Sequence, residues 1–391
     1  MMMMSDQVRR SRLVVTYDGV DITADVSPYI IGFAFTERAR HGESDELSIA
    51  FQNVDQLWNN GWWPERGASV SAKLEVENWY QPGDAYRIDC GTFEIDDLTD
   101  SGPPSVFVIG ALSVGITSSI RGEEVTRAWE NIKLSEIVGQ LAKKHGFKVY
   151  FDSEYDPIFD RFDQKKQSDL AFILKIAEYA GLQVRLSHGK LIVYQDSLYD
   201  QQEIALTITK NYDGYLGHHF RASSSDIFTA CHVMYLDSKT RKLLTYQYSP
   251  EGRSGTLEKT SVSSTGATTA QMIDQKTRML IPAKIVAGKK EEDDSISLPN
   301  VGKVLKIHRR CSSLAEAEKL AKSSLRNKNR RELSGTLDLM GNPALRAGMV
   351  IALNGFGRWD TARYAIEEVT HNWSKSQGLI TQAGIRGIMG Y

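Results

Sequence analysis

The chain has 391 residues, of which 41% are hydrophobic and 25% charged, a composition that is ordinary for a globular protein. Its 47 Lys and Arg residues against 49 Asp and Glu residues leave a net charge of −2. This balance argues against a protein that mainly coats nucleic acid, because neutralising phosphates requires a basic excess. The three cysteines, Cys90, Cys231 and Cys311, are far apart and show no CxxC spacing, which argues against a disulfide framework or a zinc site.

Residues 1–12, MMMMSDQVRRSR, are expected to form a disordered N-terminal tail. No apolar segment follows them, so no signal peptide is predicted. No apolar run approaches the roughly 18 residues that a membrane-spanning helix needs. We therefore expect a chain that folds in a cytoplasm and does not itself insert into a membrane.

Residues 13–118 are predicted to form a β domain. Leu47, Ile49 and Phe51 alternate with small or polar residues, which is the period of a half-buried strand. Asp18-Gly19 is a hairpin turn pair, and an acidic turn is predicted after Ile95. Other strands are predicted at 13–17, 20–23, 70–76 and 105–112. Several short strands separated by turn residues are typical of a sandwich or barrel.

Residues 119–200 are predicted to form a small α+β module. Apolar residues recur at helical spacing from 132 to 142, and Gly146 is a normal helix stop. Ser168 is the predicted N-cap of a second helix that ends at Gly181. A hairpin with His188-Gly189 at its turn is predicted to follow.

Residues 201–391 are predicted to form a second β domain. Strands are predicted at 228–236, 243–248, 333–339, 349–354, 363–370 and 379–386. The polar stretch 250–300 is predicted to be an insertion, with a short helix at 270–280. A strong helix is predicted over 313–328, because Ser313 and Glu316 form a capping box. Its apolar face is expected to pack on the second β domain.

We find no sequence motif for catalysis, for a nucleotide or for a metal ion: no GxSxG, HExxH, Walker loop or GxGxxG is present. The acidic stretch 152–163 resembles a calcium loop at its first positions. Pro157 replaces the glycine that the turn needs, however, and Asp163 replaces the final glutamate. A solvated acidic loop is the favoured interpretation. No catalytic residue, cofactor or metal ligand is predicted.

Two groups of residues are candidates for packing or interface roles. Trp58, Trp62 and Trp63 form an aromatic cluster, for which core or interface packing is favoured over carbohydrate or base stacking. His371 stands near the end of a strand without a paired nucleophile, so a structural hydrogen bond is favoured over a role as base. The basic residues of the C-terminal helix, from Lys319 to Arg331, are read as a solvated face or subunit interface and not as a nucleic-acid site.

Three groups of motifs, taken together, are similar to a known family. The N-terminal group contains Ser44–Ile49 (SDELSI), Trp58, Trp63-Pro64 and Gly91–Asp96 (GTFEID). The central group contains Leu134–Ile137 (LSEI) and Gln167–Ile173 (QSDLAFI). The C-terminal group contains Gly341–Val350 (GNPALRAGMV) and Glu368–His371 (EVTH). In this order and spacing they resemble the late-control, D-type tail proteins of contractile phages, in particular the baseplate hub proteins of Mu-like phages and prophages.

This resemblance implies a mainly β fold with an α+β insert, in which two tail-tube-like β-barrel domains accompany the small α+β domain. It implies a non-enzymatic homotrimer in the virion tail, whose six barrels form a pseudo-sixfold ring between the tail tube and the central spike. Other baseplate proteins are expected partners, and the genome is expected to pass the lumen without specific binding. Gly341, Pro343 and Gly348 of the third motif become structural or interface candidates. The alternative is a cell-wall or polysaccharide hydrolase or binding module of a phage tail.

Overall fold

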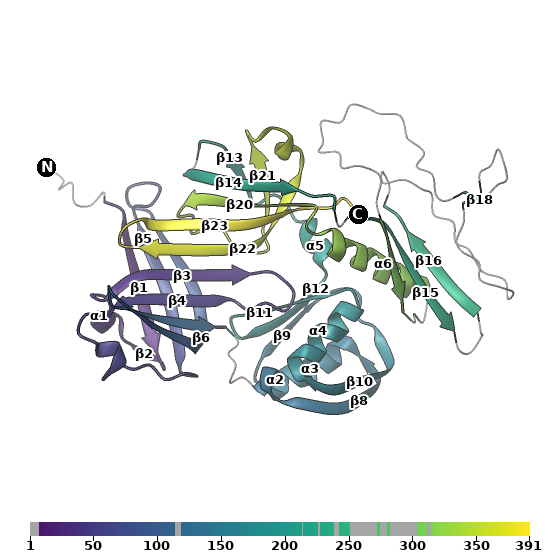
Figure 1. Ribbon diagram of the computed structural model, residues 1–391, viewed down its shortest axis with the longest axis horizontal. Helices are drawn as coiled ribbons and strands as arrows, with labels where there is room; N and C mark the ends of the chain where they lie inside the picture. The colour runs from purple at the N-terminus through teal and green to yellow at the C-terminus, as the bar shows by residue number, and fades with distance from the viewer. Residues whose placement is uncertain are drawn as a thin grey trace.

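A 13-stranded sheet runs through most of the chain in this computed structural model (Figure 1). The structure describes residues 8–113, 119–212, 214–225, 227–237, 242–250, 272–273, 280–281, 303–309, 311 and 314–391. The main path of the sheet has the order β14-β20-β23-β22-β3-β4-β7-β6-β5-β1-β2, and β13 and β21 extend it beside β22. The fold is mainly β with a few helices, as predicted.

The first part of the chain supplies one end of this sheet, which we call the first half-sheet. It comprises β1 (Arg10–Tyr17), β2 (Val20–Asp21), β3 (Ile30–Arg38), β4 (Glu46–Gln52), β5 (Ser69–Glu77), β6 (Ala85–Ser101) and β7 (Val106–Leu112). All of its strand pairs are antiparallel. A short helix, α1 (Thr23–Val26), and a 3-10 helix at Leu57–Asn59 lie in its connections.

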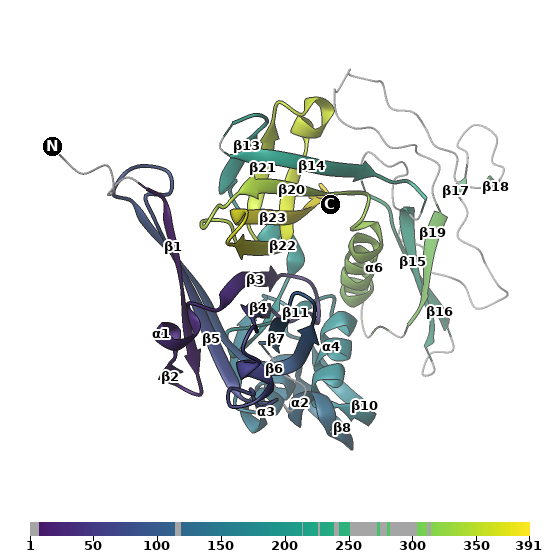
Figure 2. The same ribbon diagram turned by 60° about the vertical axis from the view of Figure 1, so that its left-hand side comes forward.

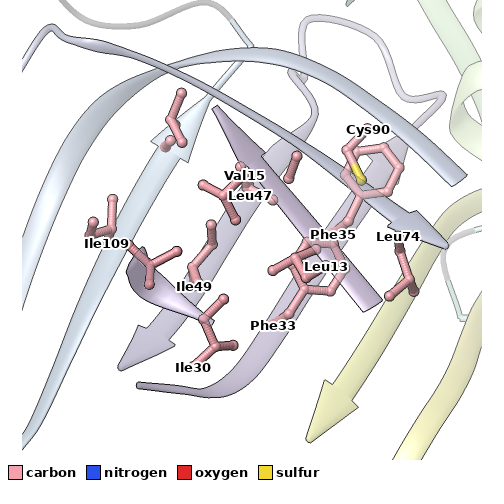
Figure 3. Packing of buried hydrophobic residues seen from close by; sticks show 14 of the residues in the cluster. Leu13, Val15, Ile30, Phe33, Phe35, Leu47, Ile49, Leu74, Cys90 and Ile109 are labelled. Atoms are coloured by element: carbon pink, nitrogen blue, oxygen red, sulfur yellow. The ribbon is translucent and has the colours of Figure 1, made fainter. Parts of the chain in front are cut away.

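The first half-sheet curves around one hydrophobic core. Leu13 of β1 and Phe35 of β3 come from opposite ends of its strand order, yet both belong to this core (Figure 3). Strand β4 shows the predicted alternation, with Leu47, Ile49 and Phe51 buried. Burying each such side chain contributes roughly 1.5–3 kcal/mol, so the alternation fixes which face of each strand points inward.

The last part of the chain supplies the second half-sheet. It comprises β13 (Leu206–Thr209), β14 (Tyr215–Ala222), β20 (Leu333–Met340), β21 (Val350–Asn354), β22 (Arg363–Ser374) and β23 (Gly378–Gly387), with a 3-10 helix at Gly357–Thr361. It has a core of its own, to which Ile208, Leu337 and Ile385 belong. The closure of either half-sheet into a tube-like barrel stays a prediction.

The two half-sheets are joined strand to strand. Residues 368–374 of β22 pair with residues 32–38 of β3 in antiparallel register, and the two strands lie side by side in Figure 1. The preceding residues of β22 pair instead with β21. Strand β22 therefore stays paired with β23 along its length but changes its other partner from β21 to β3, with a bulge at Glu367 where the change occurs.

The α+β module lies beside both half-sheets (Figure 2). It comprises α2 (Ser119–Gly122), β8 (Glu124–Lys133), α3 (Leu134–Lys144), β9 (Lys148–Asp152), β10 (Ile158–Ser168), α4 (Asp169–Tyr179), β11 (Gln183–Ser187), β12 (Lys190–Tyr194) and α5 (Asp196–Asp200). Helix α3 buries Leu134, Ile137 and Leu141 at helical spacing. The predicted cap is present, because Ser168 Oγ accepts a hydrogen bond from the Ala171 backbone N–H at 3.2 Å.

A fourth unit, which we call the helix-capped sheet, was not expected. Strands β15 (Phe228–Asp237), β16 (Lys242–Tyr248) and β19 (Lys303–His308) form a separate three-stranded sheet, covered by α6 (Leu314–Asn329). The helix packs, as predicted, on strands within residues 201–391, but these strands form a sheet of their own and are not part of the large sheet. Its apolar residues Leu320 and Leu325 share a core with Val233, because the central strand β15 pairs with β16 and β19 and not with the large sheet.

Other local predictions need correction. The acidic turn after Ile95 is part of β6, because Asp96 to Asp100 continue the ladder with β7 past a bulge. Residues 10–12 of the predicted tail pair with β5, whereas residues 1–7 lie outside the described residues.

The predicted helix at 270–280 is wrong where it is described: β17 (Met272–Ile273) pairs with β18 (Leu280–Ile281). Short apolar segments do not distinguish strand from helix by periodicity. The rest of the 250–300 insertion and Ser313 of the capping box lie outside the described residues.

Candidate assembly site at the junction of the modules

Residues 341–349, which we call the junction loop, lie where the two half-sheets meet. The Gly341 N–H donates to the Leu379 carbonyl at 2.8 Å, and the Gly341 carbonyl accepts a hydrogen bond from the indole of Trp79, which follows β5. A Cβ at position 341 would lie 2.8 Å from Cζ2 of Trp79 and would also overlap with Leu379. Only glycine permits this close approach of the first half-sheet to β23.

The junction loop also connects to the α+β module. The Ala347 N–H donates to Glu37 Oε2 at 3.1 Å, and the Arg185 guanidinium donates to Glu37 Oε1 at 2.7 Å. Arg185 also lies 3.8 Å from a carboxylate oxygen of Asp45. Burial raises the pKa of Asp45, and the charge of Arg185 opposes that rise. One arginine of β11 therefore balances two buried carboxylates of the first half-sheet.

A second set of contacts, which we call the ion-pair cluster, joins the α+β module to the second half-sheet and to α6. It consists of Arg326, Arg330, Arg386, Asp196, Asp200 and Glu367. Arg386 of β23 binds Asp200 of α5 through both terminal nitrogens, at 2.7 and 3.2 Å. The same guanidinium lies 3.1 Å from Asp196 and 3.3 Å from Glu367.

The ion-pair cluster is largely buried, with Arg386 and Asp200 at its centre. The side chains of Arg386 and Asp200 are only 3% and 4% exposed. Burial alone would raise the pKa of Asp196 and Glu367, but the neighbouring arginines hold both pKa values below their usual range. A cavity of about 270 Å³ adjoins the cluster and is lined by Tyr194 and Met349 among others.

Helix α6 is attached to the α+β module as well. The Lys319 ammonium lies 3.7 Å from the ring centroid of Tyr155, and Gln183 donates to Asn327 at 3.1 Å. Arg326 and Arg330 are buried in the ion-pair cluster. The reading of this helix as a solvated basic face is therefore wrong for these two arginines. No pattern in the sequence indicated their partners: Asp200 is 126 residues from Arg326, and Asp196 and Glu367 are 134 and 37 residues from Arg330.

The sequence-predicted candidates fall into two places. Gly341, Pro343, Gly348 and His371 gather at the junction. Pro343 is buried, and its carbonyl accepts a hydrogen bond from Arg346 at 3.0 Å. Gly348 has φ +95°, which favours glycine, and its N–H donates to the Ile366 carbonyl at 2.8 Å. Trp58, Trp62 and Trp63 lie together near one end of the first half-sheet, where Trp58 is buried and the other two are exposed.

His371 is buried between β3 and β23. Its Nδ1 is 3.0 Å from Thr381 Oγ1, and its ring stacks on Phe35 at a centroid distance of 6.3 Å. Burial, together with the charge of Arg346, lowers the pKa of His371 to about 3. The ring is therefore neutral at physiological pH, which agrees with a structural hydrogen bond.

We expect His371 to make the junction sensitive to mild acid. Between pH 6.5 and pH 3 the unfolded chain binds a proton on His371 that the folded chain does not, so stability falls as pH falls through this range. Between pH 7.5 and 5.5 the loss from this residue should be about 1–2 kcal/mol. Urea unfolding of the native protein and of His371→Gln at both pH values measures it. An equal loss in the two proteins would contradict the assignment.

The described residues contain no group of three or more His, Cys, Asp or Glu side chains placed to hold a metal ion. The stretch 152–163 is not a solvated loop throughout, since residues 158–163 belong to β10. Asp156 accepts hydrogen bonds from the backbone N–H and the hydroxyl of Ser135 at the start of α3, at 2.9 and 2.6 Å. Over the described ranges, no helix combines the length and the apolar character needed to cross a membrane.

Comparison with known proteins gives sequence relatives and structural neighbours. No family model matches the chain. The chain is 24% identical over 234 residues to a probable baseplate hub protein of Escherichia phage 186, and 26% identical over 231 residues to that of Escherichia phage P2. The matches cover 59% and 58% of this chain but only 57% and 56% of the relatives, so the chain matches little more than half of their length.

The whole fold has neighbours among solved structures. A tail protein from Neisseria meningitidis MC58 superposes with a TM-score of 0.62 at 10% identity and covers 96% of both chains. The 43 kDa tail protein of prophage MuSo2 from Shewanella oneidensis gives 0.61 at 12% identity and covers 96% of this chain and 98% of its own. The chain is thus similar in sequence to phage baseplate hub proteins and similar in fold to prophage tail proteins, which confirms the resemblance predicted from its motifs.

Proposed function

We propose that this chain is the structural hub subunit of a contractile phage tail or of a prophage-derived injection device. Three copies close into a ring that joins the tail tube on one side to the central spike on the other. The observation that carries this proposal is the continuous sheet, in which two half-sheets are joined through β3 and β22. Its likeness to prophage tail proteins over 96% of the chain supports the same role.

The physical argument concerns symmetry and rigidity. Three chains with two half-sheets each would present six similar lobes, which suits an adaptor between a sixfold tube and a threefold spike. Such an adaptor transmits force only if its lobes keep a fixed orientation, and the junction loop and ion-pair cluster supply buried contacts for that purpose. Among the described strands, β14 pairs with β20 alone, so its other side is an unpaired sheet edge. A closed ring of subunits can cover such an edge.

The proposed partners follow from this role. They are two further copies of the chain, the central spike protein, the tail tube protein and other baseplate proteins. The chain would assemble in the host bacterial cytoplasm and reside in the virion tail, with the genome passing its lumen without specific binding. No catalysis is proposed, since the curated relatives are named as baseplate hub proteins.

The test of this proposal is the mass of the purified protein. We expect a species of three times the 43.8 kDa of one chain by light scattering coupled to sizing chromatography, with threefold averages in electron micrographs. A strict monomer at tens of micromolar, or an average without threefold symmetry, would contradict the ring. Robust loss of turbidity from purified peptidoglycan would favour the alternative of a hydrolase.

A further inference from the structure

The described surface has an apolar pocket away from the junction, which we call the tryptophan pocket. Its volume is about 480 Å³, and it opens where β1, α1 and the segment 57–64 meet. Core residues Val15 and Phe51 form part of its floor, and Trp62 and Trp63 form part of its rim. Asp25 contributes a carboxylate to the lining.

The rim of the pocket is held in place by the core below it. Trp58 packs on Phe51 at a centroid distance of 4.0 Å, and Trp62 meets Trp58 edge to face at 5.5 Å. The segment that carries them is fixed by Asn53, whose side chain accepts from the Trp58 N–H and donates to Asn59. A rigid aromatic rim loses little conformational entropy when a partner binds, which is the usual property of an interface anchor.

The surroundings of the pocket are unusually apolar for a surface. Trp63 is 56% exposed and Trp62 37%. Val20, which pairs with the pocket residue Tyr17, and Val54, which follows the Asn53 that binds the Trp58 N–H, are each more than 60% exposed. Large exposed apolar side chains that gather around a cavity mark a binding surface more often than a solvent-facing one.

The charges around the pocket are mainly negative. Asp18 and Asp21 flank Val20, Asp55 follows Val54, and Glu65 follows the pocket residue Pro64. Together with Asp25 these five carboxylates are exposed. The cations nearby are Arg12, whose charge acts on Asp21, Arg66, and Lys375, which donates a hydrogen bond to the Pro28 carbonyl at 3.3 Å. This excess of negative charge repels nucleic-acid phosphates and anionic lipid and attracts a basic partner.

We propose that the tryptophan pocket docks a segment of a different protein that presents an apolar side chain flanked by lysine or arginine. The apolar side chain enters the pocket between Trp62 and Trp63, and a flanking cation pairs with Asp25 at its edge. The volume accommodates one or two large side chains, which is the scale of a hot-spot contact and not of a whole interface. The proposal holds whether or not the chain forms the ring proposed above.

The probe is the capped peptide Lys-Lys-Leu-Phe-Lys-Lys, titrated into the full chain and followed by calorimetry and tryptophan fluorescence. Two further capped peptides are controls: Glu-Glu-Leu-Phe-Glu-Glu and Lys-Lys-Ser-Ser-Lys-Lys. We expect the first to bind at least tenfold more tightly than either control, with a dissociation constant that rises with salt. Trp63→Ala should weaken its binding about tenfold, and Asp25→Asn about threefold.

Tyr150→Ala is the matched control, because Tyr150 is an equally exposed aromatic residue on β9 of the α+β module. It should leave peptide binding unchanged, and the urea midpoints of all three variants should match that of the parent chain. The proposal is overturned if the acidic peptide binds as well as the basic one, or if Trp63→Ala has no effect on the affinity. It is also overturned if Trp63→Ala abolishes self-association of the chain, because a second copy would then be the occupant of the pocket. Binding of anionic vesicles in place of the basic peptide would overturn it as well.

Discussion

Replacing Arg386 by methionine should lower the free energy of unfolding by about 3–5 kcal/mol. Arg386 is 3% exposed and contacts Asp196, Asp200 and Glu367. Removing one member of a buried ion-pair network leaves the opposite charges buried and only partly compensated. The resulting loss of stability exceeds the net stabilisation that the intact pair contributes. Urea denaturation at pH 7.5, followed by circular dichroism, measures the change.

Arg161→Met is the matched control for Arg386→Met. Arg161 also forms ion pairs, with Glu130 at 3.1 Å and Asp163 at 3.0 Å, but its side chain is 62% exposed. The control should change stability by less than about 1 kcal/mol. In addition, Arg386→Met combined with Asp200→Asn should be less destabilised than the sum of the single changes, because the neutral amide needs no counter-charge. Equal effects at positions 386 and 161 would mean that the cluster adds nothing beyond a surface pair.

The ion-pair cluster also predicts a second acid transition, distinct from that of His371. The pKa values of Asp196 and Glu367 are lowered in the folded chain, so their contribution to stability is complete above their unfolded pKa values and is lost as pH falls through the folded ones. The contribution of His371 to the free energy of unfolding starts to fall at a higher pH, from about 6.5 downward. On acidification the loss from His371 should therefore begin first, and the loss from the ion-pair cluster should add to it below the unfolded pKa values of Asp and Glu.

Replacing Gly341 by alanine is expected to destabilise the chain by about 3 kcal/mol, near the upper end of the cost of overpacking. The added Cβ would meet Cζ2 of Trp79 at 2.8 Å and would overlap with Leu379. Both neighbours are buried, Trp79 at 6% exposed and Leu379 at 2%, so neither has free space into which to move. The same urea denaturation assay measures the loss.

Gly139→Ala is the control, and we expect it to change stability in the opposite direction. Gly139 lies inside α3, and a Cβ there would meet nothing within 4 Å. Alanine should stabilise that helix by about 1 kcal/mol, because glycine is the poorer helix former. If Gly341→Ala were as well tolerated as Gly139→Ala, the close approach of the two half-sheets at the junction loop would not be needed for the fold.

The local structure of this chain was largely predictable from its sequence. Asp18-Gly19 and His188-Gly189 both form hairpin turns with positive φ at each residue, and Ser168 caps its helix as predicted. Strands β4, β5 and β7 follow the alternation of buried and exposed positions. These features depend on residues within a few positions of each other, where turn geometry, capping and hydrophobic period act directly.

The candidate site was predictable only in part. The motif that holds Gly341 and Gly348 was identified from its resemblance to a family, but no pattern indicated that Trp79 and Glu37 are its partners. The ion-pair cluster was missed completely. Arg386 and Glu367 occur in strands whose apolar faces were recognised, and a charged residue on the other face of a strand is usually solvated. Here α5 and α6 cover that face, which only the fold reveals.

The sequence by itself determined many of the strands, the three long helices α3, α4 and α6, the two hairpin turns and the resemblance to tail hub proteins, because short-range preferences and motif spacing act along the chain. Only the tertiary structure decided that β22 pairs with β3, that α6 covers a separate sheet, and that three arginines and three carboxylates share one buried cluster. These choices join residues up to 342 positions apart, as in the pairing of Gly32 with Ser374. They depend on which strand edges pair with one another and on which buried charges balance one another in space. No local preference encodes either choice.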